Sequence, residues 1–412
     1  MYILGIETSC DETAISLIEA NEASNSVRVL GNTVHSQIDV HIPYGGVFPN
    51  LAKREHAKNL IPVLAQTLEQ AGAIESAPID GPSVITPDLE PVLASIFTYE
   101  PELLEAVMAF IPTIRKPRVD LISITVGPGL TPALWVGINF ARALSIIWNI
   151  PLAASNHMEG HILAALISKT DLPLGGPGTI VDATGSYDLL DRRITYPALS
   201  LLISGGHTQI ILVEKVGSYK IIGQTRDDAV GECFDKIART LGLQYPGGPK
   251  ISALAAQARA EGIESPEPLP RPMISSDDFD FSFSGLKTSV LYLTKRLTAD
   301  GKTLSVDQIK GIAREAEDAM TDVLVAKMKK AVEAFGIETV IVGGGVVANA
   351  HIRKALETLA VSEGLRILVP QIDHSTDNAL MIALAGYFGR DKALAPGTEL
   401  KAFGTLPVGP RI

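Results

Sequence analysis

The sequence predicts an α/β protein of two similar lobes, and three observations indicate this fold class. A pattern of two hairpin strands, a third strand and a helix at the N-terminus recurs in the middle of the chain. A strand, a glycine-rich turn and a helix follow in the C-terminal third. The chain has 412 residues, 46% of them hydrophobic, which is enough for more than one core. We therefore expect a duplicated two-lobed fold.

The first pattern begins directly at the N-terminus. Its expected elements, in order, are a strand at Tyr2–Ile6, a polar turn at Glu7–Thr13, a returning strand at Ala14–Ala20, a third strand containing Val29–Thr33 and a helix at Asn50–Ala71. Alternating apolar positions in the strands and helical spacing in the last segment support this reading.

The second pattern repeats this order roughly 190 positions later. Its expected elements are a strand at Ala198–Ile203, a turn at Ser204–Thr208, a strand at Gln209–Val213, a strand containing Ile221–Thr225 and a helix at Ala229–Leu241. A chance likeness between two short hairpins is the alternative. Duplication predicts two facing turns, one in each lobe, that can hold a nucleotide phosphate between them.

The third glycine-rich turn is also of a type that binds phosphate. Glu338–Val342 reads as a buried strand, Gly343–Gly345 as a tight turn and Ala348–Thr358 as a helix. Glycine allows main-chain N–H groups to approach an anion without a Cβ in the way. The sequence contains no Gly-x-x-x-x-Gly-Lys-Ser/Thr motif, so it is not a P-loop protein. Tight turns without ligands are the alternative for each glycine turn.

Three further segments complete the expected organisation. Ser305–Phe335 is the clearest helix, and Ser305 and Gln308 have the spacing of a capping box. Two stretches read as insertions or loops, one at about 73–118 with a short helix near Pro101–Phe110, and one at about 169–197. We assign no chemistry to either insertion.

Composition and charge exclude several classes of protein. No apolar run reaches the roughly 18 residues of a membrane span, and no signal peptide precedes the first strand, so we expect a cytoplasmic protein without a membrane partner. The two cysteines, Cys10 and Cys233, form neither a disulfide framework nor a zinc knuckle. The net charge of −11 argues against a protein that coats nucleic acid, although a local patch can still bind RNA. Three groups of basic residues are candidate patches, and each can also be ordinary surface charge: Lys53, Arg54 and Lys58; Arg115, Lys116 and Arg118; and Arg192 and Arg193.

Two histidines in an apolar segment have the spacing of metal ligands. His157 and His161 lie four residues apart in an expected helix over Ala153–Ile167, so both imidazoles project from one face. Asp377 stands in a polar loop just before an expected helix at Ala379–Tyr387 and is a candidate third ligand. Two imidazoles and one carboxylate leave coordination positions open, as catalysis requires. Packing or surface histidines are the alternative for the pair alone.

The same segment differs from the zinc-protease motif His-Glu-x-x-His. In that motif the glutamate directly follows the first histidine and acts as general base. Here Met158 occupies that position, and Glu159 lies about 200° around the helix from His157. This geometry disfavours peptide hydrolysis.

With these residues the sequence resembles the tRNA N6-adenosine threonylcarbamoyltransferase family (TsaD), formerly named O-sialoglycoprotein endopeptidase, over nearly the whole chain. The motifs that carry the resemblance occur in family order. They are Gly5–Thr13, Tyr44–Val47, Gly127–Leu130, Asn156–His161, Ser204–Gln209, Gly231–Glu232 with Phe234–Lys236, Tyr245–Pro249, Asp280–Thr288, Gly344–Val346 with Ala348–Asn349, and Thr376–Asn378.

The resemblance implies a fold of the actin, Hsp70 and sugar-kinase (ASKHA) type, with mixed sheets flanked by helices. On this basis we expect an N-terminal lobe over 1–153, completed by a C-terminal helix at about 379–412 and carrying the insertion at about 73–118. The C-terminal lobe is expected over 154–378, with the metal and nucleotide sites and the insertion at about 169–197.

The resemblance also implies the reaction and its participants. The donor is threonylcarbamoyl-adenylate, the acceptor is N6 of adenosine 37 in tRNAs that read codons beginning with A, and the leaving group is AMP. The implied cofactor is one divalent metal ion per subunit held by His157, His161 and Asp377, with Fe²⁺ expected from the family and Zn²⁺ as the alternative. The implied protein partners are a paralogous subunit and a small ATPase, although organellar relatives work without them.

Carried over residue by residue, the family pattern also gives the substrate contacts. They are Leu202, Ile203, Ser204, Gly205, Gly206, Asp235, Gly248 and Asn349. No general base is evident, and the candidates for a catalytic role are Asp11, Glu12 and Lys287. This chain departs from the common family pattern at Val347, where a small residue is usual, and at Thr131–Pro132, where a glycine is often found.

Three other functions are alternatives to the transferase, and each would need different sequence features. An actin-fold kinase or ATPase acting on a small metabolite would need a carboxylate base and no His-x-x-x-His pair. A metalloprotease has only the paired histidines and the old family name in its support. A non-enzymatic nucleotide-binding scaffold would not need a complete ligand set.

Overall fold

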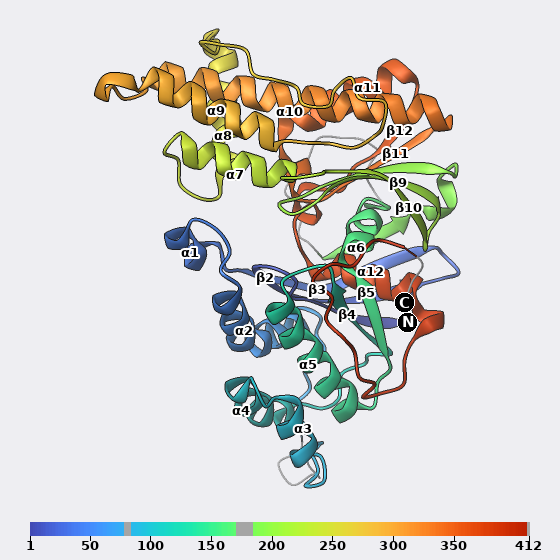
Figure 1. Cartoon of the computed structure of the whole chain (residues 1–412). Helices are drawn as coiled ribbons and strands as arrows, with labels where there is room; N and C mark the ends of the chain where they lie inside the picture. The colour runs from blue at the N-terminus through green and yellow to red at the C-terminus, as the bar shows by residue number, and fades with distance from the viewer. Residues whose placement is uncertain (78–83, 170–183, 410–412) are drawn as a thin grey trace. The chain divides into compact units, whose positions relative to one another are not determined.

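The structure is a computed structural model that describes residues 1–77, 84–169 and 184–409 (Figure 1). The chain folds into two compact units. Unit 1 consists of Met1–His41, Val47–Arg192 and Asp377–Ile412, and unit 2 of Ile42–Gly46 and Arg193–Thr376. In the described ranges, no helix has both the length and the apolar character that a bilayer crossing requires.

Unit 1 contains a seven-stranded mixed sheet in the order β5-β4-β1-β2-β3-β7-β6. Strands β1, β2 and β3 are antiparallel neighbours, whereas β4 pairs in parallel with both β1 and β5. The strands are β1 Tyr2–Glu7, β2 Glu12–Asn21, β3 Ser26–Ser36, β4 Leu121–Gly127, β5 Leu152–Asn156, β6 Ile167–Lys169 and β7 Gly185–Leu189.

Helices cover both faces of this sheet because alternate residues of β1 point in opposite directions. Leu4 and Ile6 share a hydrophobic cluster with α2 and α5, while Gly5 faces α12 so closely that a Cβ there would lie 2.3 Å from the Ala379 carbonyl oxygen. The unit 1 helices are α1 Ile38–His41, α2 Pro49–Gln70, α3 Glu90–Ile96, α4 Pro101–Phe110, α5 Thr131–Trp148, α6 His157–Ala164 and α12 Ala379–Phe388.

Unit 2 repeats the topology of the unit 1 sheet. Its five strands lie in the order β10-β9-β8-β11-β12, with β8, β9 and β10 antiparallel and β11 parallel to β8 and β12. Reading each sheet from its third antiparallel strand gives the same sequence of pairings in both units. The strands are β8 Ala198–Ile203, β9 Thr208–Lys215, β10 Ser218–Gln224, β11 Thr339–Gly343 and β12 Arg366–Leu368.

The helices of unit 2 share one hydrophobic core with β8. Leu199, Leu201 and Ile203 alternate along the strand and belong to this core. The helices are α7 Val230–Thr240, α8 Gly247–Glu261, α9 Ser284–Leu297, α10 Val306–Phe335 and α11 Ala350–Glu363 (Figure 1). The capping box predicted for the longest helix is present, since Ser305 Oγ accepts from the Gln308 N–H and the Gln308 side chain accepts from the Ser305 N–H.

The predicted fold class is confirmed, because two mixed sheets with helices repeat one strand order. The two predicted hairpins, the third strands and the helices that follow them all form, with bounds that shift by a few residues. The helix predicted at Pro101–Phe110 forms with those bounds.

Three sequence-based predictions differ from the structure. Residues 153–156 of the predicted helix over Ala153–Ile167 belong to β5, and the helix is the shorter α6, because these residues extend the parallel sheet next to β4. The helix predicted over about 379–412 ends at Phe388. Beyond it, Leu394 exchanges main-chain hydrogen bonds with Leu152, and the Phe403 N–H donates to the Val126 carbonyl oxygen. The stretch predicted as a loop at about 169–197 contains β7, which pairs with β3; its residues 170–183 lie outside the described part.

The boundary between the compact units also differs from the lobe boundary expected at 153/154. Unit 1 continues through Arg192 and resumes at Asp377, so His157, His161 and Asp377 all belong to unit 1. The reason is that α6 packs against α12, which belongs to unit 1. Gly160 and Ala164 of α6 face Met381 and Ile382 of α12.

A buried polar network supports the turn between β1 and β2. His56 of α2 is fully buried, with Nδ1 2.7 Å from Thr13 Oγ1 and Nε2 3.0 Å from the Cys10 carbonyl oxygen. Gln37 extends the network from His56 to His41. Burial lowers the pKa of His56 to about 4, so the imidazole is neutral in the folded protein.

This network predicts a loss of stability in acid. The unfolded chain takes up a proton on His56 below its ordinary pKa of 6.5, whereas the folded protein resists protonation until about pH 4. Stability therefore falls as the pH is lowered from 6.5 to 4, by roughly 3 kcal/mol in all. In melting-temperature measurements between pH 4.5 and 7, His56→Gln should flatten the slope. His35→Gln, which changes an exposed histidine, should leave the slope as in the wild type, and equal slopes for all three proteins would contradict the prediction.

Candidate functional site

The first part of the candidate metal site is the start of α6. Asn156 ends β5 and caps α6, since its Oδ1 accepts hydrogen bonds from the N–H groups of Met158 and Glu159. This cap begins the helix at His157, which places His161 one turn further on the same face. Both histidines are buried, with 7% and 1% of their surface exposed.

The second part is the residue that precedes α12. Asn378 caps this helix by accepting a hydrogen bond from the Met381 N–H, and Asp377 stands directly before the cap. Because α12 packs against α6 through Gly160, the loop before α12 lies beside the two histidines. A Cβ at Gly160 would come within 3.1 Å of the Met381 side chain, so a larger residue would push the two helices apart.

The three predicted ligands converge on one point. Asp377 Oδ1 lies 3.1 Å from His161 Nε2 and 3.5 Å from His157 Nε2, and one ligand atom from each residue lies within 4.8 Å of the others. The buried nitrogens of His161 make no hydrogen bond of regular geometry to any described residue. Two imidazole nitrogens and a carboxylate oxygen therefore fit a divalent transition-metal ion, for which such donors are usual ligands.

Two carboxylates, those of Asp377 and Glu7, act on the charge of His157. Burial opposes protonation of His157, but the carboxylates of Asp377 and Glu7 outweigh it and hold the pKa of His157 well above its usual value. Burial likewise opposes ionisation of Asp377, while the two histidines lower the pKa of that carboxyl far below its usual value. In the absence of a metal, the site is thus an ion pair that a divalent cation can replace by displacing the proton.

Glu7 is a neighbour of the site that sequence reasoning missed. Its Oε2 lies 3.1 Å from His157 Nδ1, and the side chain is fully buried at the end of β1. The signal was present in the sequence, because a glutamate ends an otherwise apolar central strand, but the sequence does not say which side chain it meets.

The candidate catalytic residues lie in different places. Asp11 and Glu12 belong to the first turn of unit 1, and Lys287 belongs to α9 of unit 2. Loss of hydration, followed by the charges of Asp11 and Asp377, raises the pKa of Glu12 well above its usual value. Lys287 Nζ lies 2.7 Å from Asp228 Oδ2, in an ion pair that Lys236 shares through Oδ1.

The glycine turns of unit 2 come together at two close backbone contacts. A Cβ at Gly344, where φ is +91°, would lie 2.4 Å from the Ile203 carbonyl oxygen, and a Cβ at Gly231 would lie 2.7 Å from that of Ser204. The turn after β11 thus abuts the last residue of β8, and the start of α7 abuts the Ser204–Gly206 turn that follows it. Gly205 and Gly206 themselves face open space, with no described atom within 4 Å of a Cβ built there.

The other proposed substrate contacts of unit 2 already have structural partners. Asp235 lies one helical turn after Gly231, and its Oδ1 accepts from the N–H of Gly247, the residue before Gly248. Asn349 Oδ1 caps α11, while its Nδ2 donates to Glu317 Oε1 at 2.6 Å. Leu202 and Ile203 are fully buried in β8.

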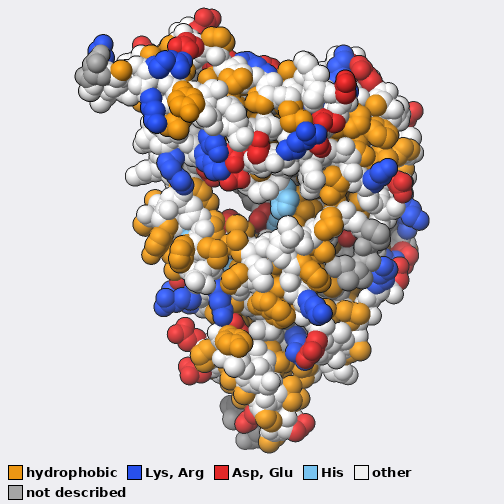
Figure 2. All heavy atoms as spheres, viewed as in Figure 1, with side chains coloured by type: hydrophobic (Ala, Val, Ile, Leu, Met, Phe, Trp, Pro, Cys, Tyr) orange, Lys and Arg blue, Asp and Glu red, His pale blue; other side chains and the backbone are white. Residues whose placement is uncertain are grey.

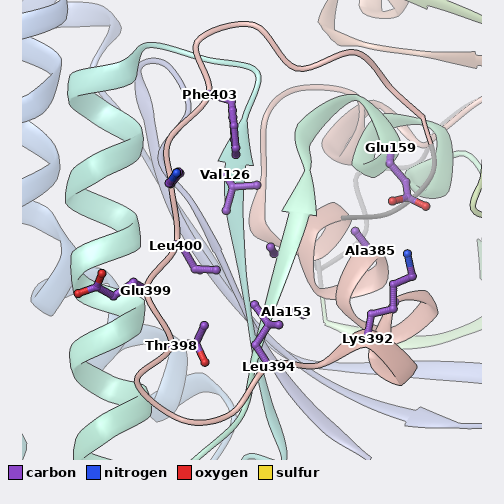
Figure 3. Close-up of a pocket in the computed structure, with 13 residues that line it drawn as sticks. Val126, Ala153, Glu159, Ala385, Lys392, Leu394, Thr398, Glu399, Leu400 and Phe403 are labelled. Atoms are coloured by element: carbon purple, nitrogen blue, oxygen red, sulfur yellow. The ribbon is translucent and has the colours of Figure 1, made fainter.

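Glu159 points into a separate cavity of about 350 Å³ in unit 1. Figure 3 shows Glu159 and Lys392 at one end of this cavity and Thr398 and Leu400 of the C-terminal segment at the other. Neither histidine is among the described residues that line it. This placement agrees with the expectation that Glu159 does not serve the histidine pair as a protease base.

Charged side chains are dispersed over the face of the molecule seen in Figure 2. Lys and Arg side chains alternate there with Asp and Glu rather than forming one continuous basic patch. This view agrees with the net charge of −11, which argues against purely electrostatic binding of nucleic acid.

The cap of α6 provides a test of how the histidines are held. Asn156 also donates from Nδ2 to the Pro407 carbonyl oxygen at 3.2 Å, which ties the C-terminal segment to the helix. Asn156→Ala should cost about 1 kcal/mol of stability and weaken metal binding, because the first turn of α6 loses its acceptor. Asn156→Asp keeps the acceptor and should bind metal more tightly than the alanine variant. Equal metal affinity of the two variants in a titration would contradict this role for the cap.

Comparison with known proteins identifies the family. The pattern of the TsaD family, described as tRNA N6-adenosine threonylcarbamoyltransferase, matches residues 28–81 and 101–384. A protein of that description from Nitrosomonas eutropha is 37% identical over 386 residues, which cover 94% of this chain and 91% of the relative. Another from Thermosipho africanus is 35% identical over 413 residues, covering 99% of this chain and 100% of the relative.

A more distant likeness is found among solved structures. Component A of (R)-2-hydroxyglutaryl-CoA dehydratase from Acidaminococcus fermentans has a TM-score of 0.43 at 14% identity, with 95% of this chain and 98% of that chain covered. The chain therefore belongs to the TsaD family, and its activity is tRNA threonylcarbamoyl transfer.

Proposed function

We propose that this enzyme transfers the threonylcarbamoyl group from threonylcarbamoyl-adenylate to N6 of adenosine 37, in tRNAs that read codons beginning with A. The observation that carries the proposal is the convergence of His157, His161 and Asp377 in a chain of this family. N6 attacks the carbamoyl carbon, the new C–N bond replaces the bond to the phosphate oxygen, AMP leaves, and N6 loses one proton.

The proposed metal ligands are His157, His161 and Asp377, which hold one divalent ion. Such an ion would supply Lewis-acid stabilisation of charge on the donor. Two nitrogens and one oxygen suit Fe²⁺, which the family implies, and also Zn²⁺. Two neighbouring residues keep the histidines in place. Glu7 contacts the His157 imidazole, and Asn156 caps the helix that carries both histidines.

We assign the adenylate to the glycine turns of unit 2. The open space at Gly205 and Gly206 supports this assignment, because main-chain N–H groups there can approach a phosphate. Ser204, Gly248 and the main chain of Leu202 and Ile203 line the same proposed site. Asp235 would accept hydrogen bonds from ribose hydroxyls through Oδ2, the oxygen that does not bind Gly247. Asn349 would contribute to the site by holding the start of α11, which it caps.

No residue is assigned as general base. AMP is a good leaving group, so orientation of the two substrates supplies most of the rate enhancement in this proposal. Asp11 and Glu12 then position the acceptor or the ligands, and Lys287 positions Asp228 on the other unit. A paralogous subunit and a small ATPase complete the proposed complex, in the cytoplasm where tRNA is available.

The direct test supplies purified protein with threonylcarbamoyl-adenylate and unmodified tRNA and measures the modified nucleoside by mass spectrometry. We expect modification of adenosine 37 only when a divalent metal is present. Parallel reactions with and without the candidate partner proteins show whether this chain suffices alone. Turnover of ATP with small metabolites, together with no tRNA modification in the presence of partners and metal, would overturn the proposal in favour of an actin-fold kinase.

A further inference from the structure

We propose that Glu7 is a positioning residue that fixes the proton of His157 on Nδ1 and thereby leaves Nε2 as the metal ligand atom. This inference deepens the proposed function and rests on the metal site assigned there. Glu7 lies at the end of β1, and its side chain has no exposed surface. Its contacts come from three separate segments of unit 1.

Both oxygens of Glu7 are held by hydrogen-bond donors. Oε1 accepts from the main-chain N–H of Ser9 at 2.5 Å, and Oε2 accepts from Thr125 Oγ1 at 2.6 Å. His157 Nδ1 lies 3.1 Å from the same Oε2. A carboxylate has only acceptors to offer, so the imidazole must be the donor in this contact.

The direction of this hydrogen bond determines which nitrogen can bind a metal. With the proton on Nδ1, the lone pair of the neutral imidazole is on Nε2, and Nε2 is the atom that faces Asp377 at 3.5 Å. A carboxylate behind a metal-bound histidine also raises the basicity of that ligand. The Ser9 hydroxyl, 3.2 Å from Nδ1, can either donate or accept and so does not fix the proton.

The two histidines differ in this respect. The Nδ1 atom of His161 has no hydrogen-bond partner among the described residues, so no comparable contact sets the tautomer of that ring. The effect of Glu7 is therefore confined to His157. Glu7 therefore sets the tautomer of one of the two histidine ligands, although it lies far from both in the sequence.

Glutamine at position 7 has the same size but cannot satisfy all three donors. If its oxygen accepts from Ser9 N–H, which is fixed by the backbone, its NH₂ group faces Thr125 and His157. The threonine hydroxyl can rotate to accept, but His157 can accept only by giving up its Nδ1 proton and carrying it on Nε2 instead. That tautomer opposes metal binding at Nε2.

The experiment measures Zn²⁺ affinity by competition with a chromophoric chelator in the wild type and in three variants. Glu7→Gln should weaken Zn²⁺ binding about 10- to 100-fold. Thr125→Val, which removes one donor to Glu7 without touching the imidazole, and Ser9→Ala should each change affinity less than Glu7→Gln. Unchanged affinity in Glu7→Gln, or an equal loss in Ser9→Ala, would overturn the role of Glu7.

A second measurement needs no substitution of Glu7. In Zn²⁺-loaded wild-type protein with ¹⁵N-labelled histidine, the His157 signals, assigned with His157→Gln, should show a protonated Nδ1. An unprotonated Nδ1 would overturn the inference even if Glu7→Gln failed to fold. Absence of any Zn²⁺ binding in the wild type would instead refute the metal centre of the proposed function, so the two failures are distinguishable.

Discussion

Replacing Asp377 by alanine should abolish threonylcarbamoyl transfer and metal binding while leaving the fold intact. Asp377 Oδ1 faces the Nε2 atoms of both histidines, so its loss removes the only anionic ligand of the candidate set. We expect a decrease in the transfer rate on the order of 10²–10³-fold or more. The helix that follows keeps its cap, because Asn378 rather than Asp377 accepts from the Met381 N–H.

Two comparisons separate loss of the ligand from disturbance of the loop. Asp373→Ala removes an exposed carboxylate from the same loop and should retain metal binding and activity. His161→Ala removes a second ligand and should reproduce the Asp377→Ala phenotype. Metal content measured by mass spectrometry and the melting temperature are recorded for each variant. Wild-type activity in a metal-free Asp377→Ala protein would refute the assignment of the site.

The features that sequence reasoning predicted well depend on local spacing. Two histidines four residues apart share a helix face wherever the helix begins, so the pair was predictable although the start of α6 was not. The error over 153–156 arose because a short apolar run is compatible with either a helix or a buried strand. Only pairing with β4 decides for the strand, and that pairing joins residues about thirty positions apart.

The features that were missed depend on contacts between distant segments. Glu7 meets His157 across the sheet, and their separation along the chain gives no local pattern. The C-terminal segment has the same property, because hydrogen bonds from Phe403 to Val126 and from Asn156 to Pro407 replace the predicted helix beyond Phe388. Gly389, Pro396 and Gly397 signalled the end of the helix, but no local pattern shows where the extended chain then binds.

Glu317→Ala should be the most destabilising of the substitutions considered in unit 2. Glu317 of α10 is fully buried, and its two oxygens bind Arg259 at 2.6 Å and Asn349 Nδ2 at 2.6 Å. Removing the carboxylate takes from Arg259 one of its two carboxylate partners and leaves the Asn349 amide without its acceptor. Such a loss costs about 2–3 kcal/mol, which corresponds to a decrease of roughly 5–10 °C in melting temperature.

The neighbouring Asp318 is the matched control for this prediction. It also pairs with Arg259, and it accepts from His351, but a quarter of its side chain is exposed. Asp318→Ala should therefore cost about 1 kcal/mol, as expected for a solvated ion pair. Glu317→Gln keeps an acceptor for Asn349 and should recover part of the stability lost in Glu317→Ala.

The same substitutions distinguish a structural role of Asn349 from a role in substrate binding. Asn349 caps α11 with Oδ1 and is oriented by Glu317 through Nδ2, so removal of the Glu317 carboxylate leaves the cap but takes away one of the contacts that orient the amide. If Asn349 presents the adenylate site, Glu317→Ala should raise the KM for the donor more than Asp318→Ala does, at a temperature where both variants are folded. An unchanged KM would mean that the Glu317–Asn349 contact stabilises unit 2 without shaping the donor site.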